Sequence, residues 1–316
     1  MAKQLSKTQP IRFMPGSIIV GKWHQKHYQI IRPLGYGARG TVFLAYGEHG
    51  RVALKFGFDN AGVISEVNVL NKFSKVQGES LGPSLYDVDD WVTKQKVYAF
   101  YAMEYIHGLP LLECIRVRGF EWMPIFVLQL LKDLGRLHEA GWVFGDLKPD
   151  NLVVTSSPLQ IRWLDVGGTT QIGRSIKEYT EFFDRGYWGF GIRKAEPSYD
   201  LFAVAMIFVN AADGCRIEKG QDSPKAKLIR YIQSHQKLAP YADVIVQALH
   251  GEFSTAEQMR KVLLEKIDET PSRVQRISKD RVAKRKSKRK VEWKGALLLV
   301  SVVLLVYTLY VALFIM

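Results

Sequence analysis

The sequence predicts an α+β fold with two lobes, followed by a basic segment and one C-terminal apolar helix. Three observations support this prediction. Short runs rich in valine, isoleucine and aromatic residues, separated by glycines, fill most of the first hundred residues and indicate strands. From Met123 onward the pattern is mostly helical. The last stretch, from Gly295 to Met316, contains no charged residue. A strand-rich part followed by a helix-rich part is typical of two lobes with a cleft between them.

The elements expected along the chain follow from these patterns. In the first lobe we expect strands over residues 17–23, 28–33, 41–46, 52–56, 85–89 and 97–104, and a helix over 61–74. In the second lobe the clearest helix is expected over 123–139. The last helix of the domain should begin at Ser254-Thr-Ala-Glu257, which has the spacing of a capping box, and should end near Ile267.

Composition limits the classes of protein that fit. The 316 residues are 47% hydrophobic, which is enough to bury the core of one large domain. The two cysteines, Cys114 and Cys215, lie far apart without CxxC spacing, so neither a disulfide framework nor a zinc site is expected. The net charge of +13 is unevenly spread. Between Arg273 and Lys294 there are eleven lysines and arginines and two acids, a net charge of +9.

The uncharged segment 295–316 has the length of a membrane-spanning helix. Its 22 residues would form a helix of roughly 33 Å, beside a hydrocarbon core of about 30 Å. A buried core helix is the alternative, but a helix that is apolar on all sides favours lipid. The basic residues before it favour a cytoplasmic location for the large domain. We therefore expect a single-pass protein of the cell membrane, with its large domain in the cytoplasm.

A glycine-rich turn lies between two predicted strands. The run Gly35-Tyr-Gly37-Ala-Arg-Gly40-Thr-Val42 has the pattern GxGxxGxV. Such glycines let backbone N–H groups approach phosphate oxygens without a Cβ in the way. Glycine turns between strands are common, so the pattern alone is a weak signal, but a dinucleotide-binding fold would need a helix after it.

A lysine stands in the predicted strand that follows. Lys55 ends the run Val52-Ala-Leu-Lys55, and a lysine in an apolar strand either reaches water or pairs with an acid. The functional interpretation is a lysine that holds the α- and β-phosphates of a nucleotide and is positioned by a helix glutamate. Glu66, in the helix expected over 61–74, is the natural partner.

The strongest signal lies in the segment 137–154. Asp146 can accept the proton of an attacking hydroxyl, Lys148 can neutralise the transferred phosphoryl group, and Asn151 can ligate Mg²⁺. Asp165, fourteen residues after Asn151, can hold the metal against the β- and γ-phosphates. Each residue alone could belong to a turn. Their order and spacing after a glycine loop and a strand lysine predict phosphoryl transfer.

With these motifs, residues 17–267 resemble a Hanks-type, eukaryotic-like Ser/Thr protein kinase domain. The resemblance implies a bilobal protein kinase fold with ATP as phosphate donor and Mg²⁺ or Mn²⁺ on Asn151 and Asp165. It implies the catalytic residues Lys55, Glu66, Asp146 and Lys148. It implies that the nucleotide contacts Gly35, Gly37, Gly40, Val42, Ala53, Lys55, Met103, Glu104, Ile106 and Val153.

Further residues extend the resemblance. Met103-Glu-Tyr-Ile106 resembles the hinge that binds adenine, with Met103 as gatekeeper. Asp200 resembles the buried aspartate that opens the central helix of the lower lobe. Lys148, two residues after the catalytic aspartate, is the mark of the Ser/Thr type. The compact domain, basic segment and terminal apolar helix are most similar to the YabT-type kinases of spore-forming bacteria, which implies a role in sporulation.

The chain departs from the family pattern at three places. Phe144-Gly145 replaces His-Arg, so the arginine that reads a phosphorylated activation loop is absent. Val166 replaces phenylalanine, and Gly189-Phe-Gly191 stands in place of Ala-Pro-Glu, which removes an anchoring glutamate. We expect these changes to affect regulation and substrate docking more than catalysis. Alanine should therefore lower activity only modestly at Thr169, Thr170, Ser175 and Thr180.

Two alternative functions stay open. Gly145-Asp146 also resembles small-molecule kinases with a His-Gly-Asp loop, such as the aminoglycoside and choline types. Lys148, the glycine loop and a short lower lobe weaken that alternative. A membrane-tethered pseudokinase scaffold is the other, and the complete set of phosphate and metal residues weakens it.

Four parts are therefore predicted along the chain. They are an N-terminal extension (1–16), a protein kinase domain (17–267), a basic juxtamembrane linker (268–294) and a transmembrane helix (295–316). Eleven cations exceed the three or four that a membrane flank requires, so the stretch Arg273–Lys294 predicts binding to DNA without sequence preference, or to anionic membrane lipid. One polyanion that binds several linkers would bring about transient kinase self-association. Protein substrates are implied by the family resemblance.

Overall fold

The structure is a computed structural model of the chain and describes residues 11–37, 39–74, 82–219 and 223–269. Contacts divide the chain into one unit of Met1–Lys266 and a second of Ile267–Met316. Apart from the end of one helix, the second unit lies outside the described residues. The fold described below is therefore that of the first unit.

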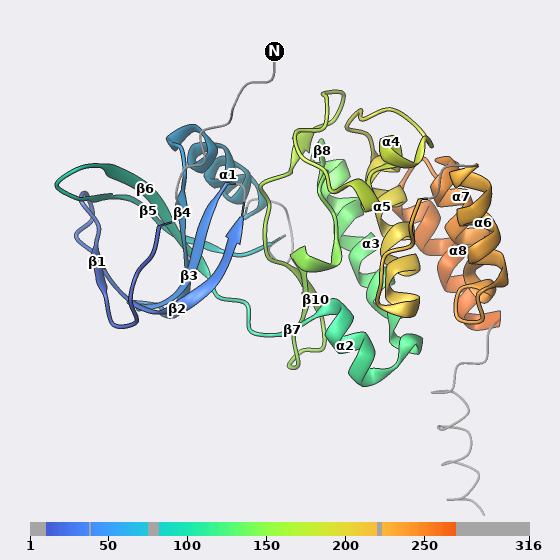
Figure 1. Cartoon of the computed structure of the whole chain (residues 1–316), viewed down its shortest axis with the longest axis horizontal. Helices are drawn as coiled ribbons and strands as arrows, with labels where there is room; N and C mark the ends of the chain where they lie inside the picture. The colour runs from blue at the N-terminus through green and yellow to red at the C-terminus, as the bar shows by residue number, and fades with distance from the viewer. Residues whose placement is uncertain (1–10, 38, 75–81, 220–222, 270–316) are drawn as a thin grey trace, which may run out of the picture. The chain divides into compact units, whose positions relative to one another are not determined.

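One antiparallel sheet forms the N-terminal lobe (Figure 1). Its strands are β1 (Ile18–Val20), β2 (His27–Gly37), β3 (Gly40–Gly47), β4 (Gly50–Gly57), β5 (Leu85–Val92) and β6 (Val97–Glu104). They lie in the order β1-β2-β3-β4-β6-β5. Helix α1 (Asn60–Phe73) packs on β4, β5 and β6. The carboxylate of Asp59 caps α1 by accepting a hydrogen bond of 2.6 Å from the amide of Gly62. The strands and the helix expected from the sequence are all present.

Aromatic side chains fill the core of this lobe. Phe43, Phe56 and Phe100 are fully buried on the sheet. Phe13 packs against the same face, with its ring centroid 5.0 Å from that of Phe43 and 5.0 Å from that of Trp91. Residues before position 17 therefore contribute to the packing of the lobe.

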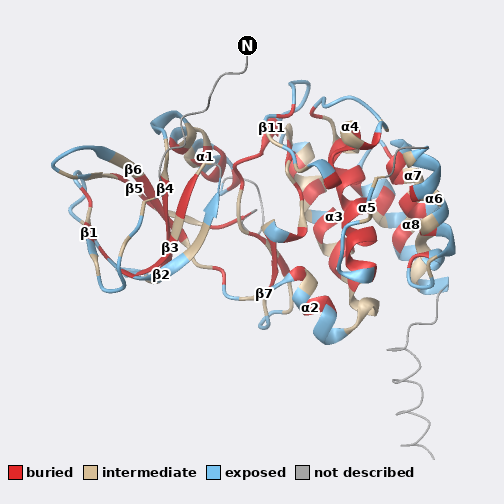
Figure 2. Cartoon of the chain, viewed as in Figure 1, coloured by how far each residue is buried: buried red, intermediate tan, exposed pale blue. Residues whose placement is uncertain are grey.

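The second lobe is helical. Its helices are α2 (Leu111–Arg118), α3 (Met123–Glu139), α4 (Arg185–Trp188), α5 (Pro197–Asp213), α6 (Pro224–Ser234), α7 (Ala242–His250) and α8 (Ala256–Glu269). Helix α5 lies in the middle, and every residue from Tyr199 to Ala212 is buried (Figure 2). A helix that is apolar on all sides is expected at such a central position.

Two small sheets position the loops of the cleft. Strands β7 (Leu109–Pro110), β9 (Leu152–Val154) and β10 (Ile161–Trp163) form one, and β8 (Trp142–Val143) and β11 (Thr170–Gln171) form the other. The loop 144–151 runs between β8 and β9, and the loop 164–169 runs between β10 and β11. Pairing of β8 with β11 and of β9 with β10 therefore holds the two loops side by side.

The start of α8 differs from the sequence prediction by one residue. The hydroxyl of Thr255 accepts a hydrogen bond of 3.2 Å from the amide of Gln258. The side-chain oxygen of Gln258 in turn accepts from the amide of Ser254 at 2.8 Å. Glu257 instead pairs with the arginine one turn later, at 2.6 Å. The predicted capping box of Ser254 and Glu257 is thus wrong. Thr255 and Gln258, which have the same capping chemistry at the same spacing, cap the helix instead.

The expected membrane localisation is corrected by the structure. Among the described residues, no helix is long and apolar enough to cross a bilayer. The longest helices there, α3 and α5, have 17 residues each, fewer than the about 20 that a span requires. The segment 295–316, on which the prediction depended, lies outside the described residues, as does the basic stretch before it.

Candidate active site

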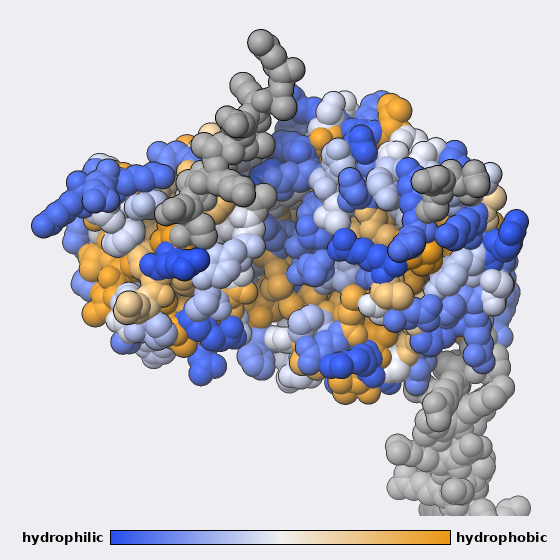
Figure 3. Space-filling model, viewed as in Figure 1, coloured by the Kyte–Doolittle hydropathy of each residue, from blue (hydrophilic) through white to orange (hydrophobic). Residues whose placement is uncertain are grey.

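A cleft of about 840 Å³ separates the sheet from the helical lobe, and Figure 3 shows the surface hollowed there. All predicted site residues except one line this cleft. From the upper lobe and the connection to the lower lobe these are Gly35, Gly37, Gly40, Val42, Ala53, Lys55, Met103, Glu104 and Ile106. From the lower lobe they are Asp146, Lys148, Asn151, Val153 and Asp165. The exception is Glu66, which is 2% exposed and lies behind Lys55.

The three glycines of the loop differ in their surroundings. A Cβ on Gly40 would lie 2.1 Å from the carbonyl oxygen of Phe56, so the pairing of β3 with β4 itself requires glycine there. A Cβ on Gly35 would meet no atom within 4 Å, and one on Gly37 only a carbonyl oxygen at 4.0 Å. Both glycines line the cleft, and the space that a side chain would occupy at each of them is open.

Lys55 forms ion pairs with two carboxylates. Its Nζ lies 2.9 Å from Oε2 of Glu66 and 3.2 Å from Oδ1 of Asp165. The Tyr101 hydroxyl also donates to Oε2 of Glu66, at 2.7 Å. Strand β4 supplies the lysine, α1 supplies Glu66, and β6 supplies the tyrosine. The predicted partnership of Lys55 with Glu66 is thus present in the geometry.

The charges of this cluster stabilise one another. Desolvation alone would lower the pKa of Lys55, but Asp165 and Glu66 outweigh it and raise that pKa. Desolvation would raise the pKa of Asp165, but Lys55 and the amide of Gly167 hold that pKa below its usual value. Burial and the adjacent Glu66 raise the pKa of the Tyr101 hydroxyl well above its usual value. Asp165 is therefore ionised at neutral pH, which its predicted role as a metal ligand requires.

Asp146 lies at the centre of a second cluster. Lys148 Nζ donates to Oδ2 of Asp146 at 2.5 Å and to the hydroxyl of Thr180 at 3.0 Å. The Thr180 hydroxyl donates to Oδ1 of Asp146 at 2.9 Å. The side-chain amide of Asn151 donates to the carbonyl of Asp146 at 2.9 Å, which leaves its oxygen free to ligate a cation. This contact of Thr180 could not be predicted from the sequence, because the separation of 34 residues from Asp146 reveals no contact.

Asp200 supports the loop beneath Asp146. Its carboxylate is fully buried and accepts from the amides of Phe144 at 2.7 Å and Gly145 at 3.0 Å. Gly145 has a φ of 84°, and a Cβ there would lie 2.6 Å from the carbonyl oxygen of Gly168. The conformation of the loop therefore requires glycine where the family has arginine.

The hinge residues lie where β6 ends. Met103 is 7% exposed and lines the cleft. The Glu104 carboxylate pairs with Arg162 at 3.0 Å and accepts from the amide of Ser84 at 3.2 Å. The side chain of Glu104 therefore fixes the hinge, as does its backbone amide, which donates to the carbonyl of Ser84 at 2.8 Å.

The activation segment, here residues 165–196, is anchored differently from the sequence-based expectation. Asp184 is fully buried and accepts from the amides of Gly186 and Tyr187, from the hydroxyl of Tyr199 at 2.8 Å, and from Arg193 at 2.7 Å. A second buried group, Arg185, pairs with a glutamate of the same segment at 2.6 Å. The segment thus has internal anchors, although the glutamate of Ala-Pro-Glu is missing. The sequence pattern does not reveal these anchors, because Asp184 and Arg185 lie outside the run Gly189–Gly191 that stands in place of Ala-Pro-Glu.

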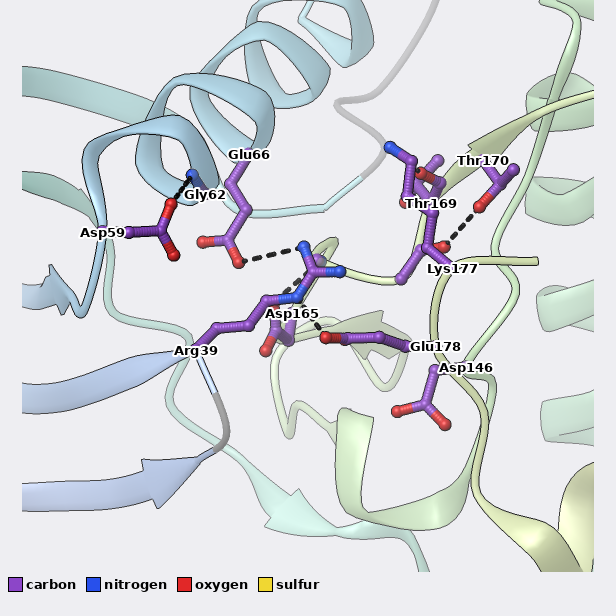
Figure 4. Close-up of polar contacts among 12 residues, drawn as sticks. Arg39, Asp59, Gly62, Glu66, Asp146, Asp165, Thr169, Thr170, Lys177 and Glu178 are labelled. Atoms are coloured by element: carbon purple, nitrogen blue, oxygen red, sulfur yellow. Dashed lines mark hydrogen bonds and ion pairs between the residues drawn. The ribbon is translucent and has the colours of Figure 1, made fainter. Parts of the chain in front are cut away.

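Arg39 was not identified from the sequence either. It lies in the glycine-rich loop and forms ion pairs with Glu66 of α1 and Glu178 of the activation segment (Figure 4). A cation in a glycine loop has no obvious partner in the sequence, since Glu178 follows 139 residues later.

This arrangement of a glycine loop, a lysine–glutamate pair and two facing loops around one cleft defines a nucleotide-dependent phosphotransferase. Residues 28–289 match the protein kinase domain family. The chain belongs to this family, and the predicted fold of a β-rich lobe and a helical lobe is confirmed.

Individual relatives agree with this assignment. The chain is 48% identical to the serine/threonine-protein kinase YabT of Bacillus subtilis over 265 residues, which are 83% of this chain and 78% of that protein. It is 24% identical to the serine/threonine-protein kinase PknG of Mycolicibacterium smegmatis over 269 residues, 79% of this chain and 33% of that protein. The predicted enzyme class, a protein kinase, is confirmed, and the serine/threonine type is that of these relatives. The roles of the individual site residues stay predictions.

Proposed function

We propose that this protein transfers the γ-phosphoryl group of ATP to serine and threonine hydroxyls of proteins, itself included. The observation that carries the proposal is the position of Asp146. Its carboxylate lies in the cleft between Lys148 and the hydroxyl of Thr180, so a hydroxyl oxygen is already accommodated within 2.9 Å of it. The serine/threonine type named for the relatives and the lysine at position 148 agree with this choice of acceptor.

Each polar group has a role in the proposed reaction. Asp146 accepts the proton of the substrate hydroxyl, and Lys148 compensates negative charge on the transferred group. Lys55, held by Glu66, binds the phosphates of the nucleotide from the upper lobe. Most of the catalytic effect arises from positioning and electrostatic stabilisation in a partly closed cleft.

Mg²⁺ or Mn²⁺ fits the donors that the cleft offers. Asp165 presents an ionised carboxylate and Asn151 a free amide oxygen, which are ligands that hard divalent cations prefer. The open space at Gly35 and Gly37 leaves room for phosphate oxygens at the loop backbone. When bound, the metal neutralises charge on the β- and γ-phosphates.

The acceptor decides between this proposal and the alternatives. Full-length protein should be incubated with γ-labelled ATP and Mg²⁺, alone, with a general protein substrate, or with an aminoglycoside or choline. The proposal expects label on phosphoserine and phosphothreonine, and none with Lys55→Ala. Label on the small molecules alone would favour the small-molecule kinase. ATP binding without any transfer would favour the pseudokinase scaffold.

We further propose that the basic stretch 273–294 binds duplex DNA without base preference and raises autophosphorylation. This proposal rests on its charge of +9. One DNA molecule that binds several copies raises their effective concentration. If about six to eight phosphates are neutralised, log K should fall with log salt with a slope of about −5 to −7. A six-alanine variant lowers the net charge of this stretch from +9 to +3 by replacing Lys284, Arg285, Lys286, Lys288, Arg289 and Lys290.

This variant should lose both DNA binding and stimulation while its basal transfer is retained. Stimulation by anionic lipid vesicles instead of DNA would assign the charge to lipid binding. No stimulation by either polyanion would contradict the proposal.

A further inference from the structure

Arg39 connects three separate parts of the kinase domain. It lies in the glycine-rich loop between β2 and β3 and reaches across the mouth of the cleft (Figure 4). Its Nε donates to Oε1 of Glu178 in the activation segment. Its Nη1 lies 3.8 Å from Oε1 of Glu66 in α1. The guanidinium thus lies between two carboxylates from segments distant in sequence.

The position of Glu66 gives this contact its importance. Oε2 of Glu66 contacts Lys55 and Tyr101, but Oε1 is buried and accepts no hydrogen bond. An ionised oxygen without a partner is costly inside a protein. Arg39, with a side chain only 23% exposed, is the cation beside Oε1, and Lys55 is the cation beside Oε2 of the same carboxylate.

The charge balance of the cleft also supports a structural role for Arg39. Glu66, Asp165 and Glu178 place three carboxylates in one region, with Lys55 and Arg39 as the cations paired with them. Without Arg39, Lys55 would remain as the cation paired with Glu66 and Asp165, and Glu178 would lose its ion pair. Repulsion would then favour outward movement of α1 and of the segment that contains Glu178.

The arginine that would read a phosphate on the activation segment is absent, so a phosphate on the exposed Ser175 would lack that partner. Gly145 occupies that arginine's place, and its φ of 84° excludes a side chain. Thr169 and Thr170 are buried, and the hydroxyl of Thr180 is bonded to Asp146. Glu178, in contrast, is an acidic residue of the same segment and is already paired with Arg39.

We propose that Arg39 is a positioning residue that ties the glycine loop to the activation segment through Glu178 and holds Glu66 against Lys55. The kinase is thereby organised for catalysis without phosphate on its activation segment. This inference rests on the proposed kinase function, which it extends to regulation.

A double-mutant cycle on the full-length protein tests the inference. Arg39→Gln should lower kcat about 10-fold and Glu178→Gln about 5-fold, with the KM for ATP within about 2-fold of wild type. The double variant should be no slower than Arg39→Gln, because Glu178 acts through the arginine. Arg39→Lys should be intermediate, since lysine keeps the charge but lacks the planar fork that contacts two carboxylates.

Matched controls remove a charge elsewhere in the same lobe. Arg32→Gln and Glu48→Gln, at exposed positions, should leave kcat unchanged. Phosphatase treatment of the wild type should change kcat less than about 2-fold, where a phosphate-dependent segment would lose about 10-fold or more.

Hydrogen exchange separates this inference from the kinase proposal. Without ATP, Arg39→Gln should raise amide exchange about 10-fold in α1 and in residues 172–180, whether or not the protein phosphorylates any substrate. Unchanged exchange in both segments would overturn the inference. The inference would also be overturned if the two single losses in kcat multiplied in the double variant. A 10-fold rise in the KM for ATP of Arg39→Gln at unchanged kcat would overturn it as well, because Arg39 would then be a phosphate ligand.

Discussion

The hydroxyl of Thr180 donates a hydrogen bond of 2.9 Å to the carboxylate of Asp146 and accepts one of 3.0 Å from Lys148. The activation segment is thus fastened to the two groups that we propose to handle the substrate hydroxyl and the transferred phosphoryl group. The expectation that alanine at Thr180 lowers activity only modestly does not agree with this contact.

Thr180→Ala should therefore lower kcat about 10- to 100-fold. A hydrogen bond to a charged group contributes about 1.5–3 kcal/mol, which corresponds to that range of rates. Thr180→Ser keeps the hydroxyl and should remain within about 3-fold of wild type. Ser175→Ala, on the exposed part of the same segment, is the control and should be unchanged. Steady-state transfer to a protein substrate measures all three, and an active Thr180→Ala enzyme would refute the role of this contact.

Asp184→Ala should destabilise the lower lobe. The substitution leaves Arg193, the Tyr199 hydroxyl and two backbone amides without their shared acceptor in a fully buried position. Loss of one partner of such a buried network costs about 3–5 kcal/mol. Urea unfolding should show this loss, whereas Asp213→Ala, which removes an exposed carboxylate, should cost less than about 1 kcal/mol. Equal effects of the two substitutions would argue against an anchor at Asp184.

Stability should fall at alkaline pH because of buried tyrosines. Burial and the adjacent Glu66 raise the pKa of Tyr101 in the folded protein well above the value of 10.0 expected when unfolded. The folded state therefore keeps this proton more tightly, so the stabilisation is complete below pH 10 and is lost as pH rises above it. Burial also raises the pKa of Tyr199.

The free energy of unfolding measured at several pH values tests this prediction. Above pH 10, Tyr101→Phe should reduce the downward slope by about 1.4 kcal/mol per pH unit. Tyr46→Phe, at a position 59% exposed, should leave the slope as it is. Equal slopes for wild type and Tyr101→Phe would contradict the prediction.

Substitution of glycine by alanine should have different effects at two positions of the glycine loop. Gly40→Ala should lower both the melting temperature and ATP affinity, because its Cβ would lie 2.1 Å from the carbonyl oxygen of Phe56. Gly35→Ala should leave the melting temperature unchanged and raise only the KM for ATP, because the space around it is open until a phosphate enters. Thermal unfolding without and with nucleotide distinguishes the two. A destabilised Gly35→Ala protein would show that this glycine serves the fold and not the nucleotide.

Sequence patterns predicted the parts of the site that follow local rules. Lys55 and Asp146 stand in motifs whose residue order reflects the chemistry, and both line the cleft. Arg39 stands at a variable position of the glycine motif and Thr180 in no motif. Their partners are 139 and 34 residues away, so only the fold reveals these contacts.

The boundaries of helices and strands show the same limit of prediction from sequence. The expected strand over 97–104 and helix over 123–139 coincide with β6 and α3. The buried residues of α3 recur at helical spacing, and β6 contains a continuous buried run from Phe100 to Met103. The start of α8 was missed by one residue, because two capping pairs of equal chemistry overlap there. Chemical pattern alone could not decide between Glu257 and Gln258.

Phosphoryl transfer by Asp146→Asn tests the proposed mechanism most directly. Asparagine has nearly the same shape as aspartate but cannot accept the proton of a hydroxyl group. The variant should bind ATP with an affinity within about 3-fold of wild type, because Asp146 does not pair with Lys55 or Glu66. Its transfer of labelled phosphate from ATP to protein should fall by a factor of about 10³, within the range for loss of a general base. Transfer within about 10-fold of wild type would show that Asp146 is not the base and would contradict the proposed mechanism.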